Sequence, residues 1–180
     1  QTLTQSIERC QRQVTRCGEI TAKMLQFGRK TETVLKATQV EPVLREIGLL
    51  LERRSRNHNV ALHIEVEPGL PPAWLDANEL EQVLVNLVNN SLDAMGRGRA
   101  ITISARQEGS QVLLQVRDDG SGIPPQDLER VFQPFFTTKP VGKGTGLGLA
   151  VVYGIVRGWG GRINAESVVG RGTTMSMRVP

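Results

Sequence analysis

The sequence predicts an α+β domain, built as a two-layer α/β sandwich and preceded by one long helix of the coiled-coil type. Three observations support this prediction. Apolar residues follow a heptad pattern that is confined to residues 1–36. Further along, short segments that alternate apolar and polar residues are interleaved with amphipathic helical segments. Two of the alternating segments are joined by a short polar turn, which is typical of a β-hairpin.

The N-terminal segment 1–36 has apolar or small side chains at alternating spacings of three and four residues. The seam consists of Leu3, Ile7, Cys10, Val14, Cys17, Thr21 and Met24. So narrow a stripe must be buried against another helix, and the chain has no second heptad segment to receive it. We expect it to pair with another copy of this helix or with a segment absent from the chain. Cys10 and Cys17 lie about 10 Å apart along such a helix, too far for a disulfide.

The main domain is expected over residues 37–180, where Pro42 is predicted to open the first helix at its first position. A strand is predicted over 59–67 and ends at the turn sequence "PGLPP". A long amphipathic helix follows, with a capping box formed by Asp76 and Glu79. Its apolar face consists of Leu80, Val83, Leu84, Leu87 and Val88.

The second half of the main domain begins with the predicted hairpin, formed by residues 100–107 and 111–118. The remaining expected elements are a short helix near 125–131, a helix over about 146–158, and closing strands over 161–167 and 173–179. Strands and helices that each carry one apolar face bury those faces against each other. We therefore expect a mostly antiparallel sheet with the helices on one face.

The composition narrows the possible functions. The 180 residues include 22 Lys and Arg and 18 Asp and Glu, for a net charge of +4, and no basic run is interleaved with aromatic residues. This is typical of a solvated surface, so we expect no nucleic-acid partner. No apolar run approaches the roughly 20 residues of a membrane span, and residues 1–30 lack a signal-peptide pattern. We expect a cytoplasmic chain, although a domain cut from a membrane-anchored protein would have the same composition.

The stretch "GKGTGLGL", residues 142–149, places four glycines just before an apolar helical segment. Glycines there allow successive backbone N–H groups to turn toward one point, where the helix N-terminus adds about half a positive charge. Such a place attracts phosphate, and Lys139 and Lys143 are close enough in sequence to add full charges. A structural turn would also explain the stretch, which matches neither of the two familiar phosphate fingerprints.

Three further segments place polar or glycine residues where a ligand could approach. One predicted helical segment carries Asn86, Asn89 and Asn90 among apolar neighbours. A half-buried asparagine side chain at such a position needs a hydrogen-bond partner. In "DDGSGIP", Asp118 ends a predicted strand, and Gly120 and Gly122 permit close approach to a flat ligand. The segment "GRGTTMSMRVP" opens the last strand with another glycine pair. Each segment also has a purely structural explanation. The asparagines could be satisfied polar residues, "DDGSGIP" a tight turn, and the last glycine pair part of an ordinary hairpin.

Together, residues 76–179 resemble the catalytic, ATP-binding domain of sensor histidine kinases, of the GHKL or Bergerat class. The N box is similar to "NELEQVLVNLVNNSLDAM", the G1 box to "DDGSGIP", the F box to "VFQPFFTTK", the G2 box to "GKGTGLGL" and the last glycine box to "GRGTT". The short lid and "NSLDAM" are similar to the nitrogen-regulation type. The helix over 1–36, which ends in "RCGEITAKMLQFGRK", resembles the second helix of the dimerisation and phosphotransfer hairpin, whose first helix is absent.

The resemblance implies a magnesium–ATP site. Asn90 would give its carbonyl oxygen to Mg²⁺, and Asn86 would support the phosphates or the water shell. Asp118 would accept a hydrogen bond from the adenine amino group and so select ATP over GTP, while Thr173 would close the adenine pocket. The other residues implied to contact the nucleotide are Gly120, Gly122, Ile123, Lys139, Lys143, Gly144, Thr145, Gly146, Leu147 and Gly148. The residues implied to act in catalysis are Asn86, Asn90 and Lys139.

Two departures from the family pattern stand out. Many members carry a basic residue where this chain has Asp93, so Lys139, Lys143, the helix end and Mg²⁺ would have to offset the phosphate charge. The family also phosphorylates a histidine followed by an acidic residue. The only histidines here are His58, in a predicted turn, and His63, in a predicted strand. We expect both to be structural, with the acceptor helix absent from the chain.

The function implied by the resemblance is that of an ATP-dependent protein-histidine kinase of a two-component system. Its γ-phosphoryl group would pass to a dimerisation-domain histidine and then to a response-regulator aspartate, in a homodimer formed through the N-terminal helix. One alternative is a related GHKL ATPase, but those enzymes have a glutamate base where this chain has Asn86, and an amide cannot take a proton at neutral pH. The other alternative is a nucleotide-sensing module that binds ATP and a partner without phosphotransfer.

Overall fold

The computed structural model describes residues 34–96, 99–140 and 144–180, together with the separate positions 5, 7, 11, 14 and 18. Those five positions are helical, and the side chains of Ile7 and Val14 are exposed. The rest of the predicted heptad helix, including Cys10 and Cys17, lies outside the described residues. The boundary between residues 36 and 37 stays a prediction.

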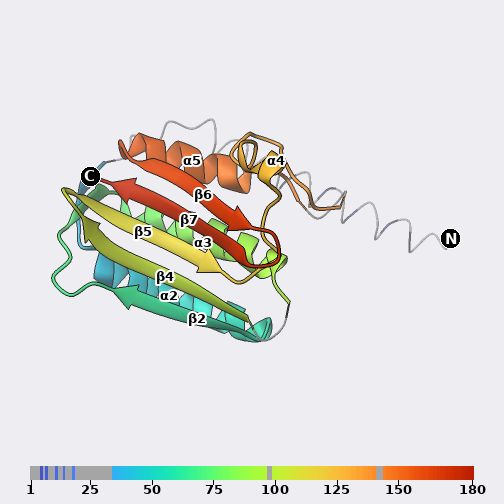
Figure 1. Ribbon diagram of the computed structural model, residues 1–180, viewed down its shortest axis with the longest axis horizontal. Coiled ribbons are helices and arrows are strands. Elements are labelled where there is room, and N and C mark those ends of the chain that lie inside the picture. Colours follow the sequence, from blue (N-terminus) through green and yellow to red (C-terminus); the bar gives the residue numbers. More distant parts are fainter. Residues whose placement is uncertain are drawn as a thin grey trace.

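A five-stranded sheet forms one layer of the domain, with the strand order β2-β4-β5-β7-β6 (Figure 1). The strands are β2 (Val60–Val66), β4 (Arg99–Glu108), β5 (Gln111–Asp118), β6 (Arg162–Val168) and β7 (Gly172–Val179). Only β2 and β4 pair in parallel, and the other neighbours in this sheet pair antiparallel. The predicted hairpin, closing strands and mostly antiparallel sheet are confirmed.

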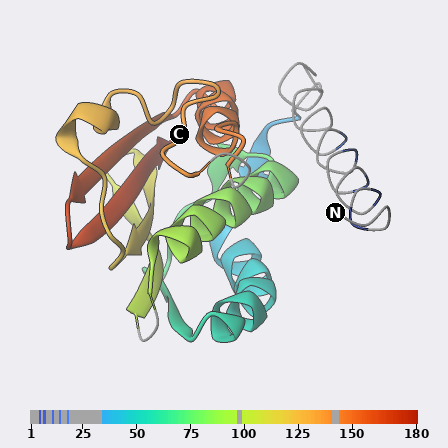
Figure 2. The same ribbon diagram turned by 90° about the vertical axis from the view of Figure 1, so that its right-hand side faces the viewer.

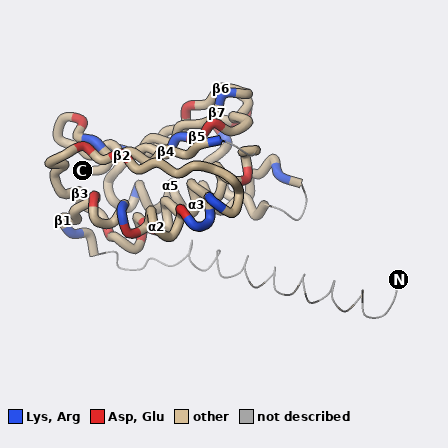
Figure 3. The backbone as a smooth tube through the Cα atoms, turned by 90° about the horizontal axis from the view of Figure 1, so that it is seen from below, with Lys and Arg blue, Asp and Glu red and all other residues tan. Residues whose placement is uncertain are grey.

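Three long helices form the second layer: α2 (Val40–Asn57), α3 (Ala77–Ala94) and α5 (Gly148–Gly158). The short α4 (Pro125–Leu128) contacts β6 instead. Seen from the edge of the sheet, α2, α3 and α5 lie together on one face (Figure 3), and α3 runs between the other two (Figure 2). This is the predicted two-layer sandwich. No helix in the described part of the chain is long and apolar enough to cross a membrane.

A second, two-stranded sheet was missed by the sequence reasoning. Its strands are β1 (Lys36–Thr38) and β3 (Ala73–Leu75), which pair antiparallel. The hydroxyl Oγ1 of Thr38 donates to the carbonyl of Leu75 at 2.9 Å, and the backbone N–H of Trp74 donates to the carbonyl of Pro180 at 2.7 Å. Strands of three residues are too short for alternation to be recognised. They join the chain before α2 to the chain end.

The two long helices begin differently. Helix α2 starts at Val40 after the N-cap Gln39, so the prediction that Pro42 occupies the first helical position is wrong. Proline is tolerated within the first turn because the N–H groups there have no partner inside the helix. At the start of α3, Asp76 Oδ1 accepts hydrogen bonds from the N–H groups of Asn78 at 2.8 Å and Glu79 at 3.1 Å. The Asp76 half of the predicted capping box is confirmed, and its reciprocal half, from the Asp76 N–H to the Glu79 carboxylate, stays a prediction.

The core lies between the sheet and the three long helices. All five predicted apolar positions of α3 are buried, the most exposed of them being Leu87 at 2%. They belong to one cluster with inward-facing side chains of the sheet and of α5. Sheet and α5 members of this cluster include Ile101, Ile103, Leu114, Val116, Val152, Val156, Met175 and Met177. This packing holds α3 against α5, with α3 contacting β5 and α5 contacting β6.

Trp159, at the C-cap of α5, is 2% exposed, and its indole Nε1–H donates to the Glu79 carboxylate at 2.7 Å. Replacing Trp159 with phenylalanine removes this hydrogen bond and is expected to cost about 1–2 kcal/mol of folding free energy. The melting midpoint should fall by a few degrees in a thermal scan. Trp74→Phe is the matched control because Trp74 is 54% exposed. Equal shifts in both variants would contradict the prediction.

Candidate functional site

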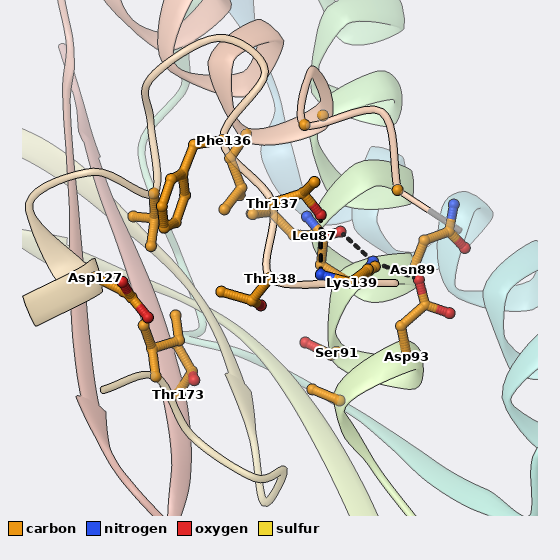
Figure 4. Close-up of a pocket in the computed structure, with 18 of the residues that line it drawn as sticks. Leu87, Asn89, Ser91, Asp93, Asp127, Phe136, Thr137, Thr138, Lys139 and Thr173 are labelled. Atoms are coloured by element: carbon orange, nitrogen blue, oxygen red, sulfur yellow. Dashed lines mark hydrogen bonds and ion pairs between the residues drawn. The ribbon is translucent and has the colours of Figure 1, made fainter. Parts of the chain in front are cut away.

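A cavity of about 740 Å³ opens between α3, the loop after β5 and the loop that leads into α5 (Figure 4). The predicted site residues that line it are Asn86, Asn90, Asp118, Gly122, Ile123, Lys139, Gly144, Thr145, Gly146, Gly148 and Thr173. These residues come from segments that are far apart in the sequence. The fold therefore brings the predicted motifs to one place.

Three predicted contact residues differ from the rest. Gly120 and Leu147 do not line the cavity, and Lys143 lies outside the described residues. The N–H of Gly120 donates to Asp118 Oδ1 at 2.8 Å, and a Cβ on Gly120 would lie 2.6 Å from the same oxygen. The Gly120 N–H therefore orients the carboxylate, and the buried Leu147 is the N-cap residue of α5.

Asp118 ends β5 and is 6% exposed, so its carboxylate needs donors. Oδ1 accepts from the N–H groups of Gly120 at 2.8 Å and Thr173 at 3.3 Å, and Oδ2 accepts from the hydroxyl of Ser91 at 2.8 Å. Ser91 was missed by the sequence reasoning because its role arises only where α3 packs against the end of β5. The three donors orient Asp118 in the cavity wall.

A second hydrogen-bond network joins the loop after β5 to the end of β6 and the start of β7. The N–H of Ile123 donates to the hydroxyl of Ser167 at 2.8 Å, and that hydroxyl donates to the carbonyl of Gly172 at 2.8 Å. The hydroxyls of Ser167 and Thr173 are 2.9 Å apart. Because Ile123 and Thr173 both line the cavity, this network holds two sides of its wall together.

Part of the wall is apolar. The apolar lining residues include Leu87, Ile123, Val131, Phe136, Leu149 and Met175. The guanidinium carbon of Arg130 lies 4.6 Å from the centre of the Phe136 ring, an arrangement that suits a cation–π contact. An apolar wall with a few fixed polar groups, such as Asp118, is typical of sites for flat small molecules.

Helix α5 begins at the opposite side of the cavity. Gly148 is its first residue, and a Cβ there would lie 3.3 Å from Asn86 Oδ1 and 3.8 Å from Asn90 Nδ2. The glycine thus lets the helix start lie close to both asparagines. The side-chain amide of Asn86 donates to the carbonyl of Gln82 at 2.9 Å. Unpaired N–H groups and the helix dipole make this end of the cavity favourable for an anion.

Lys139 also reaches this end of the cavity. Its ammonium Nζ lies 2.6 Å from Asp93 Oδ2 and 3.4 Å from Asn90 Oδ1 (Figure 4). The sequence analysis assigned Lys139 to phosphate and treated Asp93 as a departure, but it did not predict the contact between the two. Asn89 Oδ1 is buried and has no hydrogen-bond partner among the residues that the structure describes. The predicted half-buried asparagines therefore do lie in the wall of a cavity.

His58 and His63 do not line the cavity. His58 is the C-cap of α2 and His63 is an exposed residue of β2, so the predicted turn and strand positions are confirmed. Their structural role stays a prediction.

Comparison with known proteins defines the class. Residues 75–180 match the family described as histidine kinase-, DNA gyrase B-, and HSP90-like ATPase, and the chain belongs to this family. The sensor kinase CckA of Brucella abortus (strain 2308) is 38% identical over 180 residues, covering 92% of this chain and 19% of that protein. The sensor histidine kinase ZraS of Escherichia coli (strain K12) is 33% identical over 165 residues, covering 92% of this chain and 35% of ZraS.

Solved structures agree. The catalytic domain of the histidine kinase ThkA superimposes with a TM-score of 0.72 at 31% identity, covering 81% of this chain and 95% of that domain. ThkA in complex with the response regulator protein TrrA gives a TM-score of 0.79 at 26% identity, covering 100% of this chain and 52% of ThkA. The predicted kinase-type ATP-binding fold is confirmed, and the nitrogen-regulation subtype stays a prediction. The chain spans about a fifth to a third of the length of the curated relatives CckA and ZraS.

Proposed function

We propose that this chain is the ATP-binding core of a two-component sensor histidine kinase. It binds ATP and ADP and transfers the γ-phosphoryl group of ATP to a histidine of a dimerisation domain. The observation that carries the proposal is the buried Asp118, held by three donors in the wall of a cavity whose other end gathers Asn90, Lys139 and the start of α5. The end with Asp118 suits a nucleobase that carries an amino group, and the end with Asn90 and Lys139 suits phosphates.

The adenine end is explained by charge and hydrogen bonding. Asp118 can only accept, and its fixed carboxylate is complementary to the amino group of adenine. Guanine carries a carbonyl at that position and would leave two acceptors facing each other, which penalises GTP. Thr173 and the apolar wall close around the ring.

The phosphate end fits Mg²⁺. Asn90 Oδ1 already lies near a cation, the ammonium of Lys139, and amide oxygens are among the ligands that hard cations accept. Within the described residues no three His, Cys, Asp or Glu side chains gather as a metal cluster. This suits an ion that keeps several waters and takes phosphate oxygens as its other ligands. Asn90 would hold the Mg²⁺, which would offset the negative charge that develops on the phosphates during transfer.

The transfer itself needs little acid–base chemistry from this domain. A nitrogen of the incoming histidine attacks the γ-phosphorus, the bond from phosphorus to the β,γ-bridging oxygen breaks, and ADP leaves. Lys139, Asn86 and the N-terminus of α5 position the phosphates and stabilise their charge. Asn86 stands where related ATPases place a glutamate base, so hydrolysis by water is expected to be slow.

The proposed partners follow from the relatives. ThkA forms a complex with the response regulator TrrA, which supports a response-regulator receiver domain as the acceptor of phosphate from the histidine. We propose that the acceptor is neither His58 nor His63 but a histidine of the dimerisation domain. We propose that the full-length protein is a homodimer paired through its N-terminal helix, with this domain in the cytoplasm whether or not the protein has a membrane anchor.

The test of nucleotide binding is thermal unfolding with Mg²⁺ and ATP, ADP or GTP, compared with Mg²⁺ alone. A ligand at about 100 times its dissociation constant adds roughly 2.7 kcal/mol of stability and should raise the midpoint by roughly 5–10 °C. ATP and ADP should shift the midpoint and GTP should not. No shift with any nucleotide would contradict the proposal.

The test of phosphotransfer pairs the chain with a fragment that supplies the acceptor helix and follows label from [γ-³²P]ATP. Label on the histidine of the fragment supports the kinase. Absence of label despite ATP binding would favour the nucleotide-sensing module. Steady release of inorganic phosphate by the chain alone would favour the ATPase.

Replacing Asn90 with alanine is expected to remove most of the Mg²⁺ dependence of ATP binding, because the amide oxygen is the protein ligand that we assign to the metal. Calorimetric titration with ATP in EDTA and in Mg²⁺ measures that dependence. Asn78→Ala, on the first turn of the same helix, is the control. Full Mg²⁺ dependence in the Asn90 variant would refute the ligand assignment.

A further inference from the structure

Two oxygens of α3 share one cation at the phosphate end of the cavity. Asn90 and Asp93 are three residues apart on the helix, so their side chains lie on the same face. The ammonium of Lys139 lies 3.4 Å from Asn90 Oδ1 and 2.6 Å from Asp93 Oδ2. The Lys139 and Asp93 side chains are 33% and 53% exposed, so both remain accessible to solvent and to a ligand. This place therefore favours positive charge.

The proposed function requires a divalent ion beside Asn90, where Lys139 now lies. We infer that Asn90 and Asp93 form a two-oxygen cation site in which the Lys139 ammonium and the divalent metal alternate. The metal that accompanies the nucleotide takes the place of the ammonium, and Asp93 becomes a second protein oxygen donor to that metal. Displaced from Asp93, Lys139 is free to contact the phosphates. This inference rests on the proposed nucleotide site.

Electrostatics favours replacement of the Lys139 ammonium by the metal when the nucleotide binds. A carboxylate at this end of the cavity repels the triphosphate unless a cation stands between them, and Lys139 supplies only one positive charge. Mg²⁺ supplies two and brings phosphate oxygens with it, while the freed ammonium adds a further charge to the phosphates. Asp93 thereby makes nucleotide binding strongly dependent on the metal. Without metal, the same carboxylate opposes the nucleotide.

A simpler role for Asp93 is to position Lys139 through their ion pair, with no contact to the metal. The two roles differ in what happens when Lys139 is absent. A positioning residue loses its effect once the lysine is removed, whereas a metal ligand keeps it. A double-mutant cycle separates them because it measures whether the two substitutions act independently.

The experiment measures ADP binding by calorimetry, in EDTA and in saturating Mg²⁺. The ratio of the two dissociation constants is the metal coupling. It is determined for the unchanged chain, Asp93→Asn, Lys139→Ala and the double variant. Glu81→Gln, an exposed position of the same helix, is the control that matches the charge change. Asp93→Glu tests whether another carboxylate restores the coupling.

We expect Asp93→Asn to lower the metal coupling about tenfold and to strengthen ADP binding in EDTA. Asp93→Asn should lower the coupling by a similar factor when Lys139 is already alanine. Asp93→Glu should retain most of the coupling, and Glu81→Gln should leave it unchanged. All variants should keep their melting midpoints, because exposed ion pairs contribute little to stability.

Unchanged coupling in Asp93→Asn would overturn the inference, and so would a loss of coupling that disappears in the Lys139→Ala background. In either case ADP binding by the unchanged chain would leave the proposed function standing. If the unchanged chain fails to bind ADP in both conditions, the proposed function and this inference fail together.

Discussion

Replacing Asp118 with asparagine is expected to weaken ATP and ADP binding by about 1.5–3 kcal/mol, on the order of 10- to 100-fold. The substitution keeps the size of the side chain but removes the charge that strengthens a hydrogen bond from the adenine amino group. It also replaces one carboxylate oxygen by an NH₂ group. That group would face either the Ser91 hydroxyl or the two N–H donors of Gly120 and Thr173.

Calorimetric titration with ADP in Mg²⁺ measures this effect, with Asp119→Asn as the control. Asp119 is the next residue and does not line the cavity, so the same substitution there should leave affinity unchanged. The melting midpoints of both variants without nucleotide show whether the domain remains folded. An unchanged ADP affinity in a folded Asp118→Asn variant would remove Asp118 from the adenine site.

Replacing Gly172 with alanine is expected to destabilise the domain by roughly 3–5 kcal/mol. Gly172 opens β7 with a φ of 111°, a conformation that residues with a Cβ rarely adopt. A Cβ there would lie 1.9 Å from the carbonyl oxygen of Asp118. Because this contact is with backbone, relieving it requires moving β7 away from the end of β5, and with it the N–H of Thr173.

Gly170→Ala is the matched control for this substitution. Gly170 also has a positive φ, of 79°, but no atom lies within 4 Å of its ideal Cβ position. The Gly170→Ala substitution should lower the free energy of unfolding only by the cost of a positive φ in alanine, about 1–2 kcal/mol. Urea unfolding followed by circular dichroism gives both free energies, and ADP titration reports the site. Similar losses in the two variants would show that backbone conformation, and not the contact with Asp118, accounts for the effect.

The elements that the sequence predicted well are those with long, regular patterns. Helix α3 combines a cap at Asp76 with an apolar face over four turns, and the hairpin of β4 and β5 alternates on both sides of a short turn. Each pattern indicates that one face of the element is buried, and in the two-layer fold that face packs against the other layer. Strands β1 and β3 were missed because their stability comes from pairing with each other and from the contact of Trp74 with Pro180.

The site divides in the same way. The residue types needed at a nucleotide site were recognisable because glycines, asparagines and the acidic residue at a strand end occur in family-specific boxes. The sequence did not show which of these residues line the cavity, because Gly120 and Leu147 belong to the boxes and yet do not line it. The same limit hid Ser91, whose hydroxyl supports Asp118 from another element.

By itself, the sequence determined the class of fold, the family and 11 of the residues that line the cavity, since these depend on local periodicity and on motifs contiguous in the chain. Only the tertiary structure decided the partners of each side chain. The contact of Lys139 with Asp93 and Asn90 joins a loop to a helix that is 46 and 49 residues away in the chain. Such contacts depend on how α3, α5 and the strand ends pack together, and no local pattern encodes that packing.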